Sequence, residues 1–312
     1  MHLSVTVKLM RVCEVPGKGL GLESTGRLAA GTVLLEEDPL AVGWFPSQWP
    51  SRCLACCFGA AAPLGLACRQ CPRAAFCSDQ CQRDHAASSQ CALFARKLRE
   101  LEALLGSLSD EDAALALSMA DVVSAGADRV QEFRRLARAI PDHAGADDAL
   151  RRMYKTRDFS SSMSWERFRT DCQIEQNNAF GLFDHVDGQL VCFARAVYLT
   201  AARFNHSCRP NVTRIRHGKR MIFVTNRPVS PGEELSITYV QLGGSQETRQ
   251  SVLRDHYGFH CRCELCSAQK APLATVCSRC GGETIHLHNS HLCVHHDRLE
   301  IIEWIECAKN TN

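Results

Sequence analysis

The sequence predicts an α+β protein with a mostly-β core, an inserted cysteine-rich module and an inserted run of helices. Residues 5–40 and 212–237 consist of short apolar runs broken by glycine and proline, which is typical of antiparallel strands joined by tight turns. Residues 93–140 are rich in Ala, Leu, Glu and Arg, and their leucines recur at helical spacing. Residues 53–91 carry paired cysteines and almost no apolar core.

The composition is that of a globular protein: 45% of the 312 residues are apolar and 22% are charged. No apolar run approaches membrane-spanning length, and the first residues lack the apolar region of a signal peptide. We therefore expect a soluble protein of the cytoplasm or nucleus, with no membrane partner. A net charge of +2 argues against direct nucleic-acid binding and against a DNA-binding regulator, because phosphate neutralisation needs a concentrated basic surface.

The cysteines indicate zinc rather than disulfides. Most of the 19 lie in Cys-x-x-Cys or Cys-x-Cys spacings beside histidines, which is typical of zinc ligands in a reducing compartment. The module at residues 53–91 offers eight ligands for two tetrahedral ions, with Cys57 as an alternative to Cys56. These ligands are Cys53, Cys56, Cys68, Cys71, Cys77, Cys81, His85 and Cys91.

The helical region contains several predicted elements. Leucines between residues 98 and 108 indicate one helix, Ser109 caps a second that reaches Val123, and a third runs from about residue 128 to 140, before Pro141. We expect a loop at residues 142–148 and a further helix at residues 165–176.

Two site-like segments follow. Residues 203–211 read Arg-Phe-Asn-His-Ser-Cys-Arg-Pro-Asn, and Pro210 forces a turn that suits a binding loop. Residues 232–239 read Gly-Glu-Glu-Leu-Ser-Ile-Thr-Tyr, and their alternation predicts a strand that delivers Tyr239 to its end.

This pair resembles the centre of the SET-domain protein lysine methyltransferases, where such a loop and strand cross and hold S-adenosylmethionine. Residues 257–266, Tyr-Gly-Phe-His-Cys-Arg-Cys-Glu-Leu-Cys, make the chain similar to the subfamily that carries an inserted MYND zinc finger. The resemblance implies a protein-lysine N-methyltransferase acting on a histone or another protein, with a finger able to recruit a peptide partner. The alternative is a catalytically idle scaffold that recruits partners through the finger.

The resemblance also implies a domain order. It comprises the N-terminal part of the SET domain (1–52), the MYND finger (53–91), a helical insert (92–176), the C-terminal SET core (177–240), a post-SET zinc segment (241–268) and a short appendage (269–312).

Zinc ligands are implied as well. MYND ligands interleave, which assigns Cys53, Cys56, Cys77 and Cys81 to one ion and Cys68, Cys71, His85 and Cys91 to the other. His85 and Cys91 are six residues apart and would point to different faces of a continuous helix. Either the helix breaks at Ser88–Ser89 or His85 is not the ligand.

A third zinc would be bound by Cys261, Cys263 and Cys266, for which the family supplies a fourth thiol at Cys208. The sequence leaves two alternatives for Cys277 and Cys280: a fourth zinc site with Cys293 or His295 as a further ligand, or free thiols.

The resemblance places cofactor contacts at a glycine-rich turn that could equally be a plain hairpin, and at residues spread along the chain. These are Gly17, Lys18, Leu20, Asn178, Asn205, His206, Tyr239, Tyr257 and Phe259. It assigns the wall of the lysine channel to Phe180 and Tyr257. Core packing is the alternative for Tyr257 and Phe259, and a cap or turn residue is the alternative for Asn178. Tyr239 is the catalytic candidate, since the family aims this hydroxyl at the lysine amine.

Overall fold

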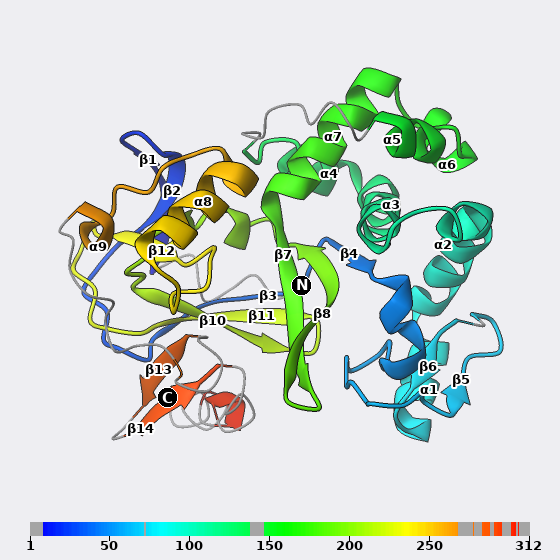
Figure 1. Ribbon diagram of the computed structural model, residues 1–312, viewed down its shortest axis with the longest axis horizontal. Coiled ribbons are helices and arrows are strands. Elements are labelled where there is room, and N and C mark those ends of the chain that lie inside the picture. The colour runs from blue at the N-terminus through cyan, green and yellow to red at the C-terminus, as the bar shows by residue number, and fades with distance from the viewer. Residues whose placement is uncertain are drawn as a thin grey trace. The chain divides into compact units, whose positions relative to one another are not determined.

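The computed structural model describes residues 9–71, 73–137, 147–267, 277, 283–287, 290–294, 301–303 and 305 (Figure 1). The chain forms two compact units. The first combines Met1–Asp38 with Thr200–Asn312, and the second comprises Pro39–Leu199. The mixed α+β class predicted from the sequence is confirmed. The predicted domain boundaries stay predictions, because the units group the segments differently.

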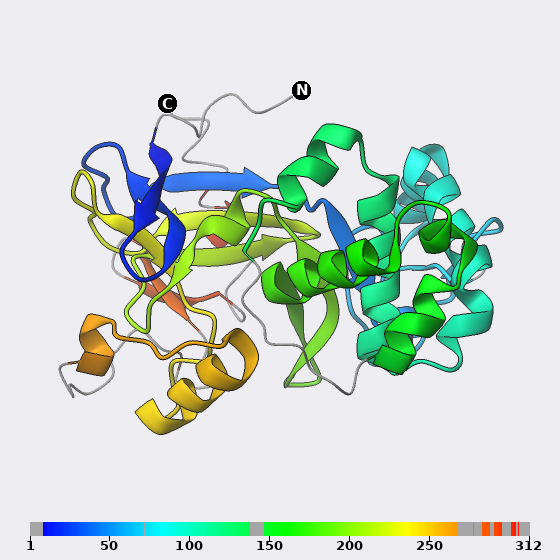
Figure 2. The same cartoon turned by 90° about the horizontal axis from the view of Figure 1, so that it is seen from above.

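The first unit contains a four-stranded sheet in the order β1-β2-β12-β9. Strands β1 (Met10–Val15) and β2 (Gly19–Ser24) form the predicted hairpin, drawn in dark blue in Figure 2. Strand β12 (Glu234–Ile237) pairs with β2 on one side and runs parallel to β9 (Asn205–His206) on the other. Segments more than 180 residues apart in the sequence therefore share one sheet.

A second, antiparallel sheet of this unit has the order β10-β11-β3, with β10 at Val212–His217, β11 at Arg220–Thr225 and β3 at Val33–Glu37. Its apolar side chains pack against Val294 and the isoleucines at 301, 302 and 305. The hairpin of β13 (Thr284–Leu287) and β14 (Ser290–Cys293) lies in the same unit. The described parts of the C-terminal appendage are thus docked on a sheet by apolar burial.

Three short elements complete this unit. The 3-10 turn η3 (Ala201–Arg203) precedes β9, and Glu37 accepts the backbone N–H groups of Thr200 and Ala201 at 2.9 Å each. Helix α8 (Gln246–Tyr257) begins at a Ser245 cap and ends at Gly258, whose φ of 72° is left-handed. Helix α9 (Glu264–Ser267) follows.

The second unit holds a sheet in the order β4-β8-β7, with β4 at Ala41–Trp44, β8 at Gln189–Val197 and β7 at Ala179–Val186. Helix α3 (Asp110–Ser124) is buried along most of its length and carries the predicted Ser109 cap. A side chain at Gly43 would come within 2.1 Å of the Ala114 carbonyl oxygen, so glycine permits α3 to lie directly on β4.

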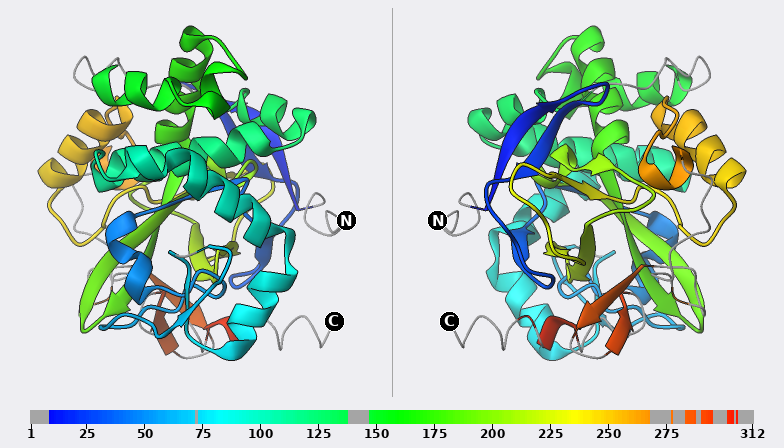
Figure 3. Two further views of the ribbon diagram at one scale, coloured as in Figure 1. Left: turned by 90° about the vertical axis from the view of Figure 1, so that its right-hand side faces the viewer. Right: turned by 90° about the vertical axis from the view of Figure 1, so that its left-hand side faces the viewer.

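The remaining elements of this unit include those of the cysteine-rich module. Helices α2 and α3 are seen in the left view of Figure 3. The remaining elements are η2 (Pro46–Ser51), β5 (Leu66–Ala67), β6 (Ala75–Phe76), α1 (Asp79–Ala87), α2 (Ser89–Leu105), α4 (Ala127–Phe133), α5 (Asp147–Tyr154), α6 (Arg157–Ser160) and α7 (Trp165–Asn178).

Two helix predictions need correction. The helix expected to reach residue 140 ends at Phe133, and the backbone continues in tighter turns through Leu136. At this end Arg134 pairs with the fully buried carboxylate of Asp171, its Nη2 lying 2.8 Å from Oδ2. The loop expected at residues 142–148 overlaps the start of α5 at Asp147; residues 138–146 lie outside the described part of the chain. None of the described helices has the length and apolar character needed to cross a bilayer.

Candidate functional site

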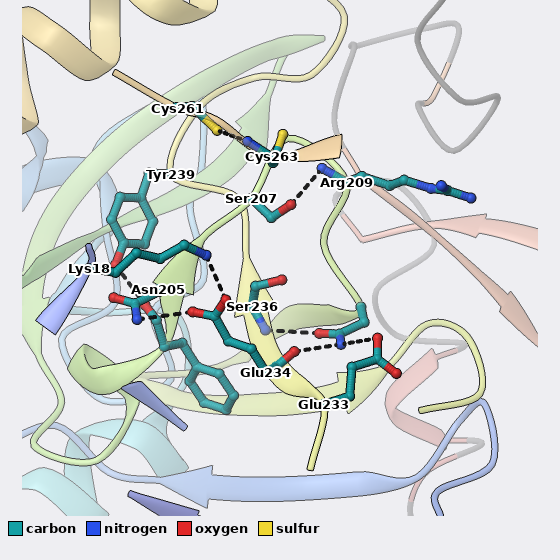
Figure 4. A network of polar contacts seen from close by, with 12 residues as sticks. Lys18, Asn205, Ser207, Arg209, Glu233, Glu234, Ser236, Tyr239, Cys261 and Cys263 are labelled. Carbon is teal, nitrogen blue, oxygen red and sulfur yellow. Dashed lines mark hydrogen bonds and ion pairs between the residues drawn. The ribbon is translucent and has the colours of Figure 1, made fainter. Parts of the chain in front are cut away.

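The two site-like segments meet as the sequence predicts, because β9 and β12 pair side by side. Asn205 lies opposite Ser236 and His206 opposite Ile237. The backbone N–H of Ser207 continues this pairing by donating to the Ile237 carbonyl at 2.9 Å. The chain then turns toward Pro210, and the Ser207 hydroxyl accepts the N–H of Arg209 at 3.0 Å (Figure 4). The loop thus leaves the sheet right after the residues expected to bind the cofactor.

The buried side chain of Asn211 forms hydrogen bonds with β12 where the loop returns to the sheet. Its Nδ2 donates to the Glu234 carbonyl at 2.8 Å and to the Glu233 carboxylate at 3.2 Å, and its Oδ1 accepts the Ser236 N–H at 2.8 Å. Asn211 is 1% exposed, so these bonds are shielded from water. Sequence reasoning assigned no role to Asn211, because only the fold brings its amide to the backbone of β12.

Lys18 and Asn205 are held by one carboxylate, that of Glu234. Lys18 Nζ lies 2.6 Å from Glu234 Oε2, and Asn205 Nδ2 donates to Oε1 at 3.0 Å (Figure 4). Both partners are cofactor candidates from the sequence, whereas Glu234 was not. A side chain at Gly21 would come within 2.6 Å of Asn205 Nδ2, so this glycine leaves room for the amide against β2.

The turn that carries Lys18 is a hairpin turn. Gly17 and Gly19, on either side of Lys18, have φ values of 73° and 77° that favour glycine. Leu20 is 54% exposed. The hairpin interpretation and the cofactor interpretation of this turn are therefore compatible, since the same turn delivers Lys18 to Asn205 and Glu234.

Tyr239 lies against the Asn205 loop. Its hydroxyl donates to the Phe204 carbonyl at 2.6 Å, and its backbone N–H donates to His206 Nδ1 at 3.0 Å. Burial raises the pKa of Tyr239 well above its ordinary value, so the phenol stays neutral at physiological pH. The Tyr239 hydroxyl is thus bound to Phe204, the residue before Asn205, and its catalytic role stays a prediction.

His206 has no features of a general base. Burial lowers the pKa of His206 to about 4, so its imidazole is neutral near pH 7. Its Nδ1 accepts from the backbone of Tyr239 and its Nε2 lies 3.3 Å from Cys208 Sγ. The ring thus lies between the backbone of Tyr239 and the Cys208 sulfur.

Aromatic rings gather around Tyr239. The Tyr257 ring lies 5.0 Å from that of Tyr239, and the Phe259 ring lies 6.0 Å from that of His206. Gly258, with its left-handed φ, separates Tyr257 at the end of α8 from Phe259. The four rings form an apolar wall beside the loop, which suits a cofactor base or an apolar channel.

The thiols of Cys208, Cys261, Cys263 and Cys266 form one cluster, all within 4.8 Å of one another. Cys208 Sγ and Cys266 Sγ are 3.6 Å apart, far from the length of about 2.05 Å of a disulfide bond. Four thiolates at about 2.3 Å from a zinc ion lie roughly 3.8 Å apart in a tetrahedron, so this donor set fits zinc. Arg209 pairs with Glu264 at 2.6 Å and ties the loop to α9.

The cysteine-rich module contains two more clusters, with the interleaved membership implied by the resemblance. One joins Cys53, Cys56, Cys77 and Cys81, and the other joins Cys68, Cys71, His85 and Cys91. Within the first, the Cys56 and Cys77 sulfurs are 3.5 Å apart; within the second, the Cys71 sulfur lies 3.3 Å from His85 Nε2. Both donor sets fit tetrahedral zinc.

The predicted helix break explains how His85 and Cys91 meet. Helix α1 ends at Ala87, Ser88 is extended with φ −88° and ψ 149°, and α2 begins at Ser89. Cys91 therefore sits in the first turn of a new helix rather than on the far face of the old one. Cys57, the spare, is buried outside both clusters with φ 64°.

Two predicted site residues belong to the second unit. Asn178 is the last residue of α7, and its amide donates to the carbonyls of Ala137 at 2.8 Å and Ile174 at 2.7 Å. Phe180, in β7, packs edge-to-face on Tyr198 with ring centroids 5.5 Å apart. Their assigned contacts with the cofactor and the lysine stay predictions.

The fourth zinc also stays a prediction. Cys277 and Cys293 belong to none of the metal-capable clusters found among the described residues. Cys280 and His295 are not among the residues that the structure describes.

Comparison with known proteins gives a family. The model of the SET domain matches residues 19–240. A SET and MYND domain-containing protein of Dictyostelium discoideum is 35% identical over 91 residues, covering 29% of this chain and 21% of that protein. The histone-lysine N-methyltransferase SMYD3 of Homo sapiens is 26% identical over 270 residues, covering 81% of this chain and 60% of that protein.

The chain thus spans between about a fifth and three fifths of the length of these two relatives. The matched region begins at Gly19, just after Lys18, and includes the Asn205 loop and Tyr239. With the crossed loop and strand and the three cysteine clusters, this match shows that the chain belongs to the SET-domain family.

Proposed function

We propose that this chain is an S-adenosylmethionine-dependent protein-lysine N-methyltransferase. The observation that supports it most is the position of the Tyr239 hydroxyl, 2.6 Å from the Phe204 carbonyl and thus beside Asn205. The family match and the printed name of the human relative, a histone-lysine N-methyltransferase, agree with this proposal. The substrate is a lysine of a histone or of another protein.

The polar pair of Lys18 and Asn205 would receive the amino-acid end of the cofactor. An ammonium and an amide, both anchored by Glu234, offer donors to a carboxylate. The backbone of His206, together with Gly17 and Leu20, would line the nucleoside, and Tyr257 and Phe259 would stack beside its base. The bound cofactor supplies a methyl group carried on a positive sulfonium.

The aromatic wall would prepare the lysine for attack. A free lysine amine has a pKa near 10.4 and is protonated at pH 7, so it must lose its proton to act as a nucleophile. Burial of the amine beside Tyr239 and Tyr257 disfavours the ammonium, and the proton leaves to water. The neutral Tyr239 hydroxyl would orient the lone pair of the amine, while the apolar rings would keep other water away.

The remaining parts of the proposal concern the second unit and partners. Asn178 would add a cofactor contact, and Phe180 would add a contact with the lysine stem. The three clusters would each hold a zinc ion, and the finger at residues 53–91 would bind a peptide of a partner protein. A location in the cytoplasm or nucleus agrees with the described cysteines, none of which forms a disulfide.

Cofactor binding separates an enzyme from an idle scaffold. In a calorimetric titration, zinc-replete protein should bind S-adenosylmethionine, and a lysate mixed with labelled cofactor should acquire label on lysines. Tyr239→Phe should lose most of the transfer while keeping the cofactor, because the ring stays and only the hydroxyl is removed. Tyr154→Phe is the matched control, since its hydroxyl only bonds the Met163 carbonyl in the second unit. A protein that binds no cofactor would support the scaffold instead.

A further inference from the structure

The carboxylate of Glu234 joins the two segments that are expected to bind the amino-acid end of the cofactor. Lys18 Nζ lies 2.6 Å from Glu234 Oε2, and Asn205 Nδ2 donates to Glu234 Oε1 at 3.0 Å (Figure 4). These partners lie 216 and 29 positions from Glu234 in the sequence, so only the folded sheet brings the three side chains together. The side chains of Lys18 and Glu234 are 39% and 25% exposed, and a ligand can therefore reach them from solvent.

The position of Glu234 in the sheet is unfavourable for a residue with a purely structural role. Glu234 in β12 lies directly opposite Glu23 in β2. Like charges that face each other on neighbouring strands repel and destabilise a sheet. Each carboxylate is balanced by its own cation, since Glu23 pairs with Arg11 and Glu234 pairs with Lys18. A neutral side chain at position 234 would remove the repulsion, so the negative charge of Glu234 indicates a role beyond the stability of the sheet.

Glu234 also determines the orientation of the Asn205 amide. An ionised carboxylate only accepts hydrogen bonds, whereas an amide has a donor end and an acceptor end. Glu234 therefore selects the orientation in which Nδ2 of Asn205 faces it, and Oδ1 is turned away from the carboxylate. Within the described part of the chain, Asn205 Oδ1 accepts no hydrogen bond. This oxygen is available to a donor group of a ligand.

We propose that Glu234 is the positioning residue for the amino-acid end of the cofactor, acting through Lys18 and Asn205 and not through its own contact with the cofactor. The inference rests on the proposed function. Glu234 holds the Lys18 ammonium, which receives the cofactor carboxylate, and it presents Asn205 Oδ1 to the α-ammonium of the cofactor. Near pH 7 an α-amino acid carries both charges, because its carboxyl has a pKa near 3.5 and its amine a pKa near 7.8.

The charge of Glu234 also sets which ligands this part of the site selects. Lys18 without a partner would attract any anion, because its ammonium is partly exposed at a hairpin turn. With Glu234 beside it, the pair has no net charge, and a bare carboxylate gains less from binding there. A ligand with both a carboxylate and an ammonium is then favoured over one with a carboxylate alone.

Ligands that differ only at the amino-acid end test the inference. Calorimetry on the full-length, zinc-replete protein compares S-adenosylhomocysteine, its analogue without the α-amino group, and 5′-methylthioadenosine, which lacks the whole amino-acid end. Glu234→Gln should weaken binding of S-adenosylhomocysteine about 10- to 100-fold, the effect of one lost hydrogen bond to a charged group, and leave binding of methylthioadenosine unchanged. The variant should also lose most of its preference for S-adenosylhomocysteine over the desamino analogue, because a glutamine accepts either orientation of the Asn205 amide.

Glu23→Gln is the matched control, since it removes the carboxylate opposite Glu234 and should keep the wild-type preferences. Lys18→Met should weaken S-adenosylhomocysteine and its desamino analogue alike. Equal losses for S-adenosylhomocysteine and methylthioadenosine in Glu234→Gln would show a structural role and overturn the inference. If Glu234→Gln does not fold, Asn205→Ala decides, because an unchanged preference for the ammonium in that variant would also overturn the inference. Wild-type protein that binds none of the three ligands would instead contradict the proposed function.

Discussion

Replacing Asn211 with alanine should weaken the crossing of loop and strand more than any other single amide change near the site. Asn211→Ala removes bonds to the Glu234 carbonyl, the Glu233 carboxylate and the Ser236 N–H. A net neutral hydrogen bond contributes about 1 kcal/mol and one to a charged group about 1.5–3 kcal/mol. Because the site is buried and two backbone groups lose their partners, we expect a loss of about 3.5–5 kcal/mol in the free energy of unfolding.

Urea unfolding, followed by far-UV circular dichroism and by tryptophan fluorescence, measures this loss through the shift of the midpoint. The matched control is Asn226→Ala, which removes a single side-chain bond, from Nδ2 to Thr213 Oγ1 at 3.0 Å, and should cost about 1 kcal/mol. Asn211→Asp should also destabilise, because it places a carboxylate beside that of Glu233. If Asn211→Ala costs no more than Asn226→Ala, the loop is held by other contacts and the reasoning is refuted.

Three further predictions concern the rest of the chain. Burial raises the pKa of Glu283 from 4.5 to about 7 despite the opposing charge of Arg214, so the contribution of Glu283 to stability should be fully present below pH 4.5 and fall by about 3 kcal/mol as pH rises from 4.5 to 7. Urea midpoints at pH 5 and 8 check this, and Glu283→Gln should flatten the profile; an unchanged profile contradicts it. Arg52→Met breaks a buried pair with Asp184 at 2.9 Å and a contact with the Phe193 ring, and should cost about 2–4 kcal/mol in thermal or urea unfolding. The exposed Arg73→Met is its control, and equal losses would argue against the buried pair. Chelation should release three zinc equivalents, measured by a colorimetric zinc assay. It should also make residues 53–91 the first target of limited proteolysis, since that module has little core of its own. Resistance of this module to protease after zinc removal would contradict the prediction.

The cysteine clusters were predictable because a tetrahedral metal imposes its spacing on the sequence. The Cys-x-x-Cys pairs and His85 could be assigned from their spacing and the resemblance. The six-residue gap to Cys91 left two alternatives, a helix break at Ser88–Ser89 or another ligand than His85, and the structure has the break. The meeting of Asn205 with the strand leading to Tyr239 followed from a resemblance, since no local pattern encodes a pairing across 31 residues.

Other features depend on contacts that a sequence pattern does not contain. Glu234 and Asn211 sit in segments identified as site-like, yet their roles come from partners brought close by folding. The helix at Ala127–Phe133 ended early where Arg134 pairs with Asp171, a residue 37 positions away, which helical propensity does not anticipate.

The most direct test of the account is lysine methylation itself. A peptide array incubated with the zinc-loaded chain and S-adenosylmethionine should show methyl groups on lysines by mass spectrometry, at levels that fall sharply with Tyr239→Phe and persist with Tyr154→Phe. Protein that holds three zinc ions and binds the cofactor, yet methylates no lysine on the array or in a lysate, would contradict the account.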